Sequence, residues 1–352
     1  MNFKIAFYIH HHGLGHLTRA MEIMKRFPDH EMIFMGSNLH FQSALPANVR
    51  VVHLPLDVAN ETDTYYHEEL PSDIFHYAPL NVSGIRDRMS IMTELFRDEF
   101  PMILIVDVSV EVALLARLCG IPTIVMRQHG KRGDLPHRLA YQSAELLIAP
   151  YPRSMYRGNE DEAYAKTLFT GGFSKFNVNG NPAKEIPNHI AILLGGGGSS
   201  LNSSVITEIA TTCPNHFFHI LGKISGDAPD LTNTTWYGHL DQPQSIIEQC
   251  TMVIGNTGHN TVMEVASLNK RFIGIPEQRP FEEQLDKAEA ISSRRGIHIL
   301  LPEHLPETNW NNLLETLQTQ QLDWTDVIAE DALAILEEAV LKTGNSVFNM
   351  QP

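Results

Sequence analysis

Short apolar runs alternate with helix-like segments along most of this chain, and no other feature limits the fold as strongly. Such runs, bounded by polar or turn-forming residues, are typical of strands buried on both faces of a parallel sheet. In the first half they fall at Lys4–Ile9, Glu31–Met35, Arg50–Leu54, Met102–Val106, Thr123–Met126 and Ala144–Ile148. Helix-like segments lie between several of them, at Leu17–Phe27, Ile85–Phe100 and Val110–Cys119. The pattern predicts the α/β class, with doubly wound sheets covered by helices on both faces.

The alternation is interrupted by a stretch rich in glycine and proline between Thr170 and Pro187. It then resumes with strand-like runs at Ile190–Leu194, Phe217–Leu221, Thr235–Tyr237, Met252–Ile254, Phe272–Ile275 and Ile297–Leu301. A chain of 352 residues is also too long for one compact core. We therefore predict two facing Rossmann-like domains, over residues 1–170 and 188–324, joined by a linker over 171–187 and followed by a C-terminal helix and tail over 325–352.

The balance of charge narrows the classes of partner. Lys and Arg number 26 against 41 Asp and Glu, which gives a net charge of −15 at pH 7. A nucleic-acid binder needs a basic face, so the composition argues against one. It also weakens the case for docking on an anionic membrane, without excluding a local basic patch. Any bound phosphate would then be held mainly by backbone dipoles and a few local cations.

The cysteines and the apolar segments predict a cytoplasmic protein. Cys119, Cys213 and Cys250 are odd in number and widely spaced, which fits neither a metal site nor a disulfide framework. The start of the chain lacks the length and cleavage pattern of a signal peptide. The longest apolar region, Met102–Met126, is broken by charged residues and reads as strand, helix and strand, not as a membrane span.

The most informative local feature is the segment Gly255–Glu264, with the sequence Gly-Asn-Thr-Gly-His-Asn-Thr-Val-Met-Glu. It follows a buried strand-like run and opens a helix, whose first backbone N–H groups have no partner within the helix and attract phosphate. Glu264 lies about two turns into that helix, where its carboxylate can accept hydrogen bonds from two neighbouring sugar hydroxyls. The combination indicates a nucleotide-sugar site, and the alternative is an ordinary strand-to-helix turn with a solvated glutamate.

Two further segments follow predicted strands of the second half. Gly195–Ser200, with four glycines and two serines, offers unobstructed N–H groups and hydroxyls that can cradle an anion. It is no Walker A loop, since no Gly-Lys-Ser/Thr follows, and its alternative is a flexible turn. In Pro276–Gln284, Gln284 offers a donor and an acceptor suited to sugar hydroxyls. A solvated helix start explains Glu282 and Glu283 better than it explains Gln284.

In the first half, the segment His10–Arg19 joins the first strand to the first helix, and its glycines allow a tight turn. Ligands bind at the carboxyl ends of strands in an open parallel sheet, so His16 would stand at the helix start and face the cleft. A neutral imidazole there can take a proton from an attacking hydroxyl. Three alternatives stay open: a dinucleotide fingerprint, although the third glycine of G-x-G-x-x-G is absent, a plain helix-start residue, and a metal site built on His10, His11 and His12.

Taken in this order, the segments resemble the MurG-like family, which includes the peptidoglycan N-acetylglucosaminyltransferase. The likeness is strongest over Trp236–Ala288, moderate at Gly13–Arg19 and Gln128–Gly130, and weak elsewhere in the first half. The resemblance implies the GT-B arrangement of two facing Rossmann-like domains. It also implies an inverting hexosyltransferase that moves a sugar from a UDP-sugar to an acceptor hydroxyl, with no metal and no cofactor beyond that co-substrate.

The resemblance also assigns roles by position. Glu264 falls on the ribose-binding carboxylate, and Leu240 on the residue whose backbone meets the uracil. The other donor-side positions are Gly196 and Gly197 in the glycine loop, Gly258, His259 and Asn260 at the diphosphate-binding helix start, and Gln284 beside the donor sugar. His16 falls on the general base, and the acceptor side takes Gly15, Arg19, Gln128 and His129.

The chain departs from the family pattern at the linker. Relatives commonly have Asn-Pro-x-Arg where this chain has Gly172–Lys175, with the sequence Gly-Phe-Ser-Lys. Lys175 would supply positive charge near the phosphates, without the forked geometry of arginine. The first half also lacks a clear apolar and basic patch of the kind that lipid-acting members often carry, so glycans, lipids and small molecules all stay open as acceptors. A non-hydrolysing UDP-sugar epimerase and a nucleotide-sugar-binding protein without turnover are the alternative functions.

Overall fold

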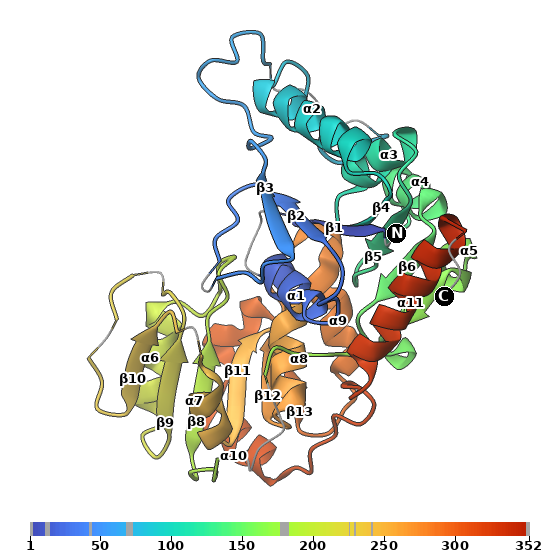
Figure 1. Ribbon diagram of the computed structural model, residues 1–352. Coiled ribbons are helices and arrows are strands. Elements are labelled where there is room, and N and C mark those ends of the chain that lie inside the picture. Colours follow the sequence, from blue (N-terminus) through green and yellow to red (C-terminus); the bar gives the residue numbers. More distant parts are fainter. Residues whose placement is uncertain are drawn as a thin grey trace.

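The computed structural model describes residues 3–10, 15–41, 44–67, 73–176, 183–224, 226–228, 230–240 and 242–349. Its strands form two separate parallel sheets, one in each half of the chain, and helices flank both sheets (Figure 1). The predicted α/β class with two doubly wound domains is therefore confirmed. The domain boundaries stay predictions, although each named strand lies on the expected side of the predicted linker.

The N-terminal sheet pairs its strands in parallel in the order β3-β2-β1-β4-β5-β6-β7. These strands are β1 (Lys4–Tyr8), β2 (Met32–Gly36), β3 (Val49–His53), β4 (Met102–Asp107), β5 (Thr123–Met126), β6 (Leu146–Ala149) and β7 (Thr167–Phe169). Its helices are α1 (Gly15–Met24), α2 (Ser83–Asp98), α3 (Val110–Leu118), α4 (Leu135–Ser143), α5 (Glu162–Ala165) and the 3₁₀ turn η1 (Arg153–Met155).

Successive residues of the central strands belong to opposite cores, which explains their continuous apolar sequence. In β1, Ala6 and Tyr8 pack in one cluster with residues of α2, α3 and α4. Ile5 and Phe7 pack in a second cluster with residues of α1 and α11. Side chains alternate between the two faces of a strand, so a sheet covered on both faces needs an apolar residue at every position.

The C-terminal sheet is also parallel, in the order β10-β9-β8-β11-β12-β13. Its strands are β8 (His189–Leu193), β9 (Phe217–Leu221), β10 (Thr234–Gly238), β11 (Met252–Asn256), β12 (Arg271–Ile275) and β13 (Ile297–Ile299). Its helices are α6 (Ser203–Thr212), α7 (Gln244–Gln249), α8 (His259–Ser267), α9 (Glu283–Ile291) and α10 (Trp310–Thr319), with 3₁₀ turns η2 (Pro280–Glu282) and η3 (Pro302–Glu307).

The last helix, α11 (Ala332–Val347), leaves the C-terminal domain and returns to the N-terminal one (Figure 1). Leu336 and Val340 are fully buried in the same cluster as Phe7 of β1. Close to its end, a Cβ on Gly344 would lie 2.2 Å from the ring of Phe3, so that contact requires a glycine. The end of the chain therefore completes the core of the N-terminal domain.

The chain crosses between the domains at two places that lie side by side. At the first crossing, Gly172 N donates to the Val327 carbonyl at 2.8 Å, and Ala329 N of the second crossing donates to the Gly172 carbonyl at 3.0 Å. A Cβ on Gly172 would lie 2.5 Å from the Val327 oxygen and 2.3 Å from the sulfur of Met263. The close pairing of the two crossings therefore depends on a glycine at position 172.

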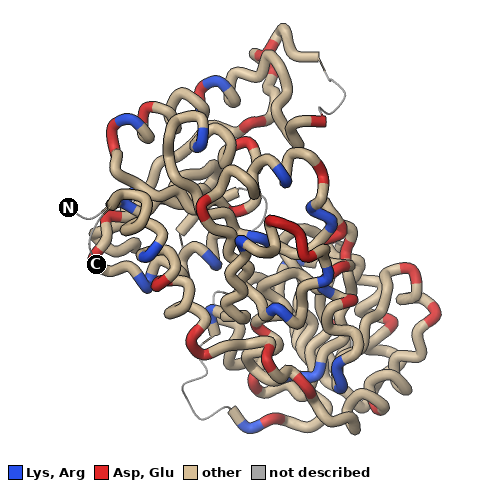
Figure 2. The backbone as a smooth tube through the Cα atoms, turned by 90° about the vertical axis from the view of Figure 1, so that its right-hand side faces the viewer, with Lys and Arg blue, Asp and Glu red and all other residues tan. Residues whose placement is uncertain are grey.

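Among the described helices, none is both long and apolar enough to span a membrane. Figure 2 shows acidic and basic residues interspersed along both domains, without a continuous basic stripe in that view. This distribution fits the net charge of −15.

Replacing Leu336 with alanine should destabilise the N-terminal domain, although the residue belongs to the C-terminal helix. Truncating a fully buried leucine costs about 2–5 kcal/mol, because the surrounding core refills the cavity only in part. Hydrogen exchange measured by mass spectrometry should show faster exchange in peptides that contain β1. Glu338→Ala, on the exposed face of the same helix, is the matched control and should leave that exchange unchanged. Equal protection of β1 in both variants would show that α11 is not part of the N-terminal core.

Candidate active site

The carboxyl ends of strands from both sheets meet between the two domains. The strand order reverses between β1 and β4 in the N-terminal sheet, and between β8 and β11 in the C-terminal sheet. Loops diverge at such a point and leave a crevice in which open α/β sheets bind their ligands. Across it, Asn260 Nδ2 of α8 donates to the carbonyl of Gly15 in α1 at 3.3 Å. The helices that follow β1 and β11 therefore touch at the crevice.

A buried carboxylate organises the N-terminal side of the crevice. Asp107 ends β4 and is 4% exposed. The Nδ1 atom of His16 lies 3.0 Å from one carboxylate oxygen, and Arg19 donates to both oxygens at 2.8 and 2.9 Å. Gln128, which follows β5, donates to the other oxygen at 3.0 Å. Three side chains from two separate segments, α1 and the segment after β5, thus converge on Asp107.

These contacts determine the charge of Asp107 and the tautomer of His16. Burial by itself would raise the pKa of Asp107, but the Arg19 guanidinium and His16 hold it well below its usual range. An ionised carboxylate can only accept hydrogen bonds, so the proton of a neutral His16 ring sits on Nδ1. The lone pair is then on Nε2, on the other side of the ring from Asp107. This arrangement suits a general base that is oriented by a carboxylate.

Asp107 did not stand out in the sequence, although a signal was present. It is an acidic residue directly after the apolar run Met102–Val106, at the carboxyl end of a strand next to the switch point. Arg19 and Gln128, expected to line the acceptor side, lie behind His16 and hold Asp107. Because both donate to Asp107, which contacts His16, they have a positioning role toward His16 that the sequence did not suggest.

His129, also expected on the acceptor side, contacts the C-terminal domain. Its Nδ1 atom lies 3.1 Å from the carboxylate of Asp286 in α9, which also accepts from Gly130 N at 2.9 Å. Burial, together with the nearby Lys287, lowers the pKa of His129 to about 4. The neutral ring therefore donates to Asp286 and ties the two domains together beside the crevice.

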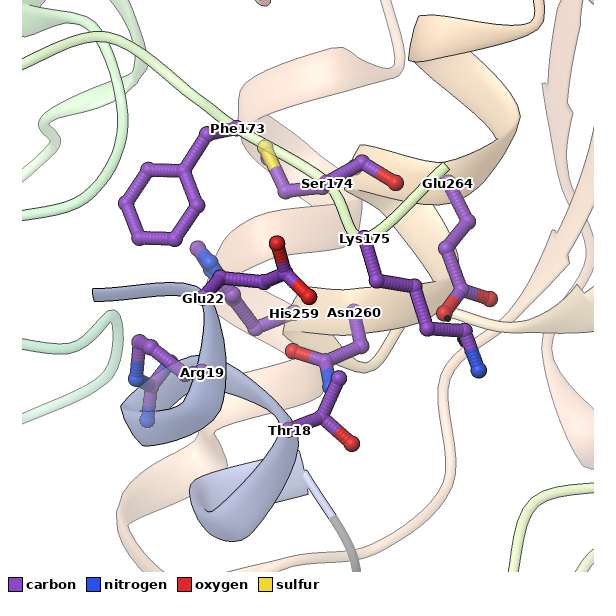
Figure 3. A pocket seen from close by; sticks show the side chains of 10 residues that line it. Thr18, Arg19, Glu22, Phe173, Ser174, Lys175, His259, Asn260 and Glu264 are labelled. Carbon is purple, nitrogen blue, oxygen red and sulfur yellow. Dashed lines mark ion pairs between the residues drawn. The ribbon is translucent and has the colours of Figure 1, made fainter. Parts of the chain in front are cut away.

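On the C-terminal side, the first turn of α8 lines a small cavity of about 270 Å³ (Figure 3). Gly258 is the N-cap, and its own N–H donates to Asn256 Oδ1 at 2.9 Å. The cavity is lined by residues of α1, the linker and α8, namely Thr18, Arg19, Glu22, Phe173, Ser174, Lys175, His259, Asn260, Met263 and Glu264. That volume includes open solvent, and the room left for a water-sized molecule is only about 10 Å³, about enough for one water, so a nucleotide sugar can enter only if α1 and α8 move apart.

Glu264 and Lys175 face each other across this cavity, at 3.6 Å between Nζ and the carboxylate (Figure 3). Burial raises the pKa of Glu264, and the Lys175 ammonium opposes that shift. Lys175 was expected near the phosphates, and the structure places it beside the carboxylate that was expected to bind the ribose. Glu264 is half-buried and Lys175 is exposed, so a sugar that enters the cavity would meet them together.

The glycine loop carries a cation that was not singled out in the sequence. Arg279, which follows β12, donates to the carbonyls of Gly197 and Gly198 at 2.7 and 2.9 Å. Gly196 has open space where a side chain would be. The next helix, α6, begins only at Ser203, with Asn202 as its cap. The loop therefore depends on Arg279, and not on a helix start within it, for positive charge beside Gly196 and Gly197.

Gln284 and Leu240 also lie at the carboxyl ends of C-terminal strands. Gln284 is buried, and its side-chain oxygen accepts from Glu277 N at 2.9 Å, while its carbonyl accepts from Thr257 Oγ1 at 2.8 Å. These bonds fix the side chain and leave its amide N–H groups as the part that can meet a sugar hydroxyl. Leu240 follows β10, at the other end of the sheet, and is half-buried against the core.

The comparison with known proteins bears on this C-terminal side. Residues 190–335 match the glycosyltransferase family 28 C-terminal domain. This match covers about two fifths of the chain and lies wholly in its second half. Two relatives are named as UDP-N-acetylglucosamine–N-acetylmuramyl-(pentapeptide) pyrophosphoryl-undecaprenol N-acetylglucosamine transferases. The one from Streptococcus equi is 25% identical over 62% of this chain and 62% of its own length. The one from a Sulfurihydrogenibium species is 24% identical over 48% and 49%.

Solved structures show the same fold at low sequence identity. MurG of Acinetobacter baumannii superposes with a TM-score of 0.59 at 14% identity, covering 96% of this chain and 99% of that one. A UDP-glucosyltransferase of Polygonum tinctorium reaches a TM-score of 0.69 at 12% identity, covering 98% and 99%. The resemblance to MurG-like glycosyltransferases and the GT-B arrangement are therefore confirmed. The chain spans about three fifths of the length of the first relative that it matches.

Within the family 28 domain, a fully buried lysine lies beside the start of α8. Lys287 of α9 is 1% exposed, and its ammonium lies 3.0 Å from Nδ1 of His259. Burial lowers the pKa of Lys287 to about 7, partly offset by Glu283. Burial, together with Lys287, also holds the pKa of His259 well below its usual range. His259 therefore stays neutral next to a lysine that changes charge near neutral pH.

The metal site considered from the sequence, on His10, His11 and His12, falls mostly outside the part of the chain that the structure describes. His11 and His12 lie outside the described residues, and the ring of His10 lies 6.0 Å from that of His16. Elsewhere among the described residues, His76, Asp134 and His137 bring ligand atoms within 4.8 Å of one another. The guanidinium of Arg132 lies 3.0 Å from Nε2 of His137, however. A positively charged arginine beside these three residues would repel a metal cation. Because Arg132 donates to Nε2 of His137, the proton of that ring is on Nδ1 and points toward Asp134. We therefore interpret the three residues as a hydrogen-bonded cluster.

The lowered pKa of Lys287 predicts that the stability of the C-terminal domain depends on pH. Its pKa falls from 10.5 to about 7 on folding, so between these values the unfolded chain binds a proton that the folded protein lacks. Stability should therefore rise with pH in that window, by up to about 1.4 kcal/mol per pH unit for a single group. Scanning calorimetry from about pH 7 to 9 should show a smaller rise for Lys287→Met than for the unmodified chain.

Lys270→Met is the matched control for this measurement. Lys270 is also buried but has a carboxylate partner, Glu185, at 2.7 Å. Its removal should lower stability at every pH without flattening the rise. Identical slopes for the unmodified chain and Lys287→Met would contradict the prediction.

Proposed function

We propose that this protein is an inverting, metal-independent glycosyltransferase that moves a sugar from a UDP-sugar to an acceptor hydroxyl. The observation that carries the proposal is the oriented pair His16–Asp107, which lies across the crevice from the start of α8 in a family 28 domain. A base on one wall and a phosphate-binding helix start on the other are the two parts that such a transfer requires.

The reaction would divide between the two domains. The acceptor hydroxyl approaches from the N-terminal side and gives its proton to Nε2 of His16. Its oxygen attacks the anomeric carbon while the bond from that carbon to the UDP oxygen breaks, which inverts the configuration. The imidazolium that forms is stabilised by Asp107, whose charge Arg19 and Gln128 hold in place. The proton later returns to solvent, and UDP leaves with the bonding electron pair.

Backbone and side-chain groups can stabilise the departing diphosphate without a metal. Among the described residues, no hydrogen-bond partner is recorded for the N–H groups of His259, Asn260 and Thr261 in the first turn of α8. Arg279 adds a guanidinium at the glycine loop. Donors already directed at the site where charge develops lower the barrier at little cost in reorganisation. We therefore propose that UDP-sugar is the co-substrate and that no other cofactor takes part.

The acceptor is a hydroxyl whose carrier the site does not identify. The two named relatives act on a pyrophosphoryl-undecaprenol, and we extend to this chain only the class of a hydroxyl on a glycan, lipid or small molecule. We propose a cytoplasmic location, where UDP-sugars would be available to the crevice. An epimerase or a binding protein without turnover is not favoured, because neither needs a base that faces an acceptor.

Replacing His16 with alanine should lower glycosyl transfer by about 10²–10⁴-fold, the usual contribution of a general base. UDP binding, measured by calorimetry, should change little, because the ring lies on the acceptor side of the crevice. Asp107→Asn removes the charge that orients the ring, so it should likewise lower glycosyl transfer and leave UDP binding little changed. Unchanged turnover in His16→Ala would remove His16 from the mechanism.

Replacing Glu264 with glutamine should weaken UDP binding by about 10- to 100-fold, because one of two charge-assisted hydrogen bonds to the ribose is lost. The unmodified chain should bind 2′-deoxy-UDP more weakly than UDP, and the variant should lose this preference. Glu307→Ala, an exposed carboxylate in the same domain, is the control. If calorimetry found the same preference for UDP in Glu264→Gln and in the unmodified chain, the ribose assignment would fail.

A further inference from the structure

Lys287 is a buried cation without a buried counter-ion. Among the described residues, its ammonium has one hydrogen-bond partner, the neutral nitrogen Nδ1 of His259. Lys270 shows the usual alternative, since it is similarly buried and donates to the Glu185 carboxylate and the Glu248 carbonyl at 2.7 and 2.6 Å. A charge removed from water normally needs such a partner. Among the described residues, the charge of Lys287 therefore has no carboxylate hydrogen-bonded to it.

The charged groups that face Lys287 do not fill this role. On its own helix, Asp286 is engaged by His129 and Gly130, and Glu283 lies 3.6 Å from Arg132. Both carboxylates raise the pKa of Lys287, but burial, Arg19 and Arg132 lower it. The other titratable groups that contribute to the field around His259 are His129 and His16. These charges together do not compensate Lys287, and one additional negative charge at the crevice would do so.

His259 connects Lys287 to the crevice. It is the first residue of α8, directly after the N-cap Gly258, and its ring lines the cavity opposite Arg19 of α1 (Figure 3). Because Lys287 occupies Nδ1, the ring proton of the neutral histidine sits on Nε2. No partner of Nε2 is recorded among the described residues. His259 therefore offers an N–H donor beside the backbone N–H groups of the first turn.

We propose that Lys287 is the buried counter-charge of the donor diphosphate and acts through His259, whose Nε2–H it holds ready to donate to a phosphate oxygen. The inference rests on the proposed function and adds to it a positioning residue and a linked proton. When the diphosphate binds, Lys287 takes one proton from solvent and becomes fully charged. When UDP leaves, that proton returns to solvent, so the cycle has no net proton uptake at this residue.

The test is the number of protons taken up when UDP binds to the full-length chain. Calorimetric titrations at about pH 8, in two buffers with different ionisation enthalpies, give this number directly. An amine with a pKa of about 7 is largely neutral at that pH, so uptake should approach one proton, roughly 0.9. Most histidines and carboxylates, and the phosphate of UDP with a pKa of about 6, stay deprotonated there and contribute little.

Comparing matched ligands and variants shows which residue takes up the proton. Uridine, which lacks the diphosphate, should bind without uptake. Lys287→Met should bind UDP about tenfold more weakly and without uptake, whereas Lys270→Met should keep the uptake of the unmodified chain. UDP binding without proton uptake, or uptake that persists in Lys287→Met, would overturn the inference and leave the proposed function standing. Failure of the unmodified chain to bind UDP would overturn both.

A second measurement tests the positioning of His259 without a ligand. Nitrogen-15 NMR of labelled histidine rings should show His259 as the Nε2–H tautomer, with its signal assigned by its loss in His259→Asn. In Lys287→Met the signal should move toward a mixture of tautomers, because nothing then donates to Nδ1. A pure Nε2–H tautomer in Lys287→Met would show that Lys287 does not position the ring.

Discussion

Asp107 is a buried anion, and the N-terminal half of the candidate site depends on how its charge is compensated. A carboxylate taken out of water is costly unless cations and hydrogen-bond donors surround it. Here the donors are His16 and Arg19 from α1 and Gln128 from the segment after β5. The order of the parallel strands brings these segments together, so the same packing that forms the core also sets the tautomer and direction of His16.

The two domains touch through polar contacts at the crevice. On the side of the crossings they touch through the chain itself and through a shared apolar cluster that includes Tyr151, Met263 and Val327. At the crevice, Asn260 meets Gly15 and Asp286 meets His129. At the crossings, Gly172 is bonded to Val327 and Ala329, and α11 is buried in the N-terminal core. Hydrogen bonds between domains can be exchanged for bonds to water or ligand at little cost, whereas an apolar core cannot. The two domains can therefore separate at the crevice while the paired crossings act as the hinge. Such a movement would make room for a ligand in the small cavity.

The chain is acidic overall, so binding an anion depends on where its cations lie. Three of them lie around the C-terminal side of the crevice, each from a different segment. Arg279 lies on the glycine loop, Lys175 beside Glu264, and Lys287 behind His259. Arg279 and Lys175 have oxygen partners within the protein, which limits the cost of their positive charge. By contrast, in the described part of the chain, Lys287 hydrogen-bonds only to the neutral ring of His259. Backbone N–H groups at the start of α8 supply the rest of the positive potential.

The sequence by itself determined the elements and the edge at which ligands would bind. Because both faces of each sheet are buried, the strands appear as continuous apolar runs, and the glycines and helix starts that follow them mark the carboxyl ends. The three-residue strand β7 (Thr167–Phe169) was too short to leave such a pattern. Only the tertiary structure decided which side chains meet: His16 with Asp107, 91 residues apart, Arg279 with Gly197, 82 apart, and Lys287 with His259, 28 apart. Local periodicity reports which face of an element is buried, but a contact between distant residues depends on strand order and domain closure, which no local pattern encodes.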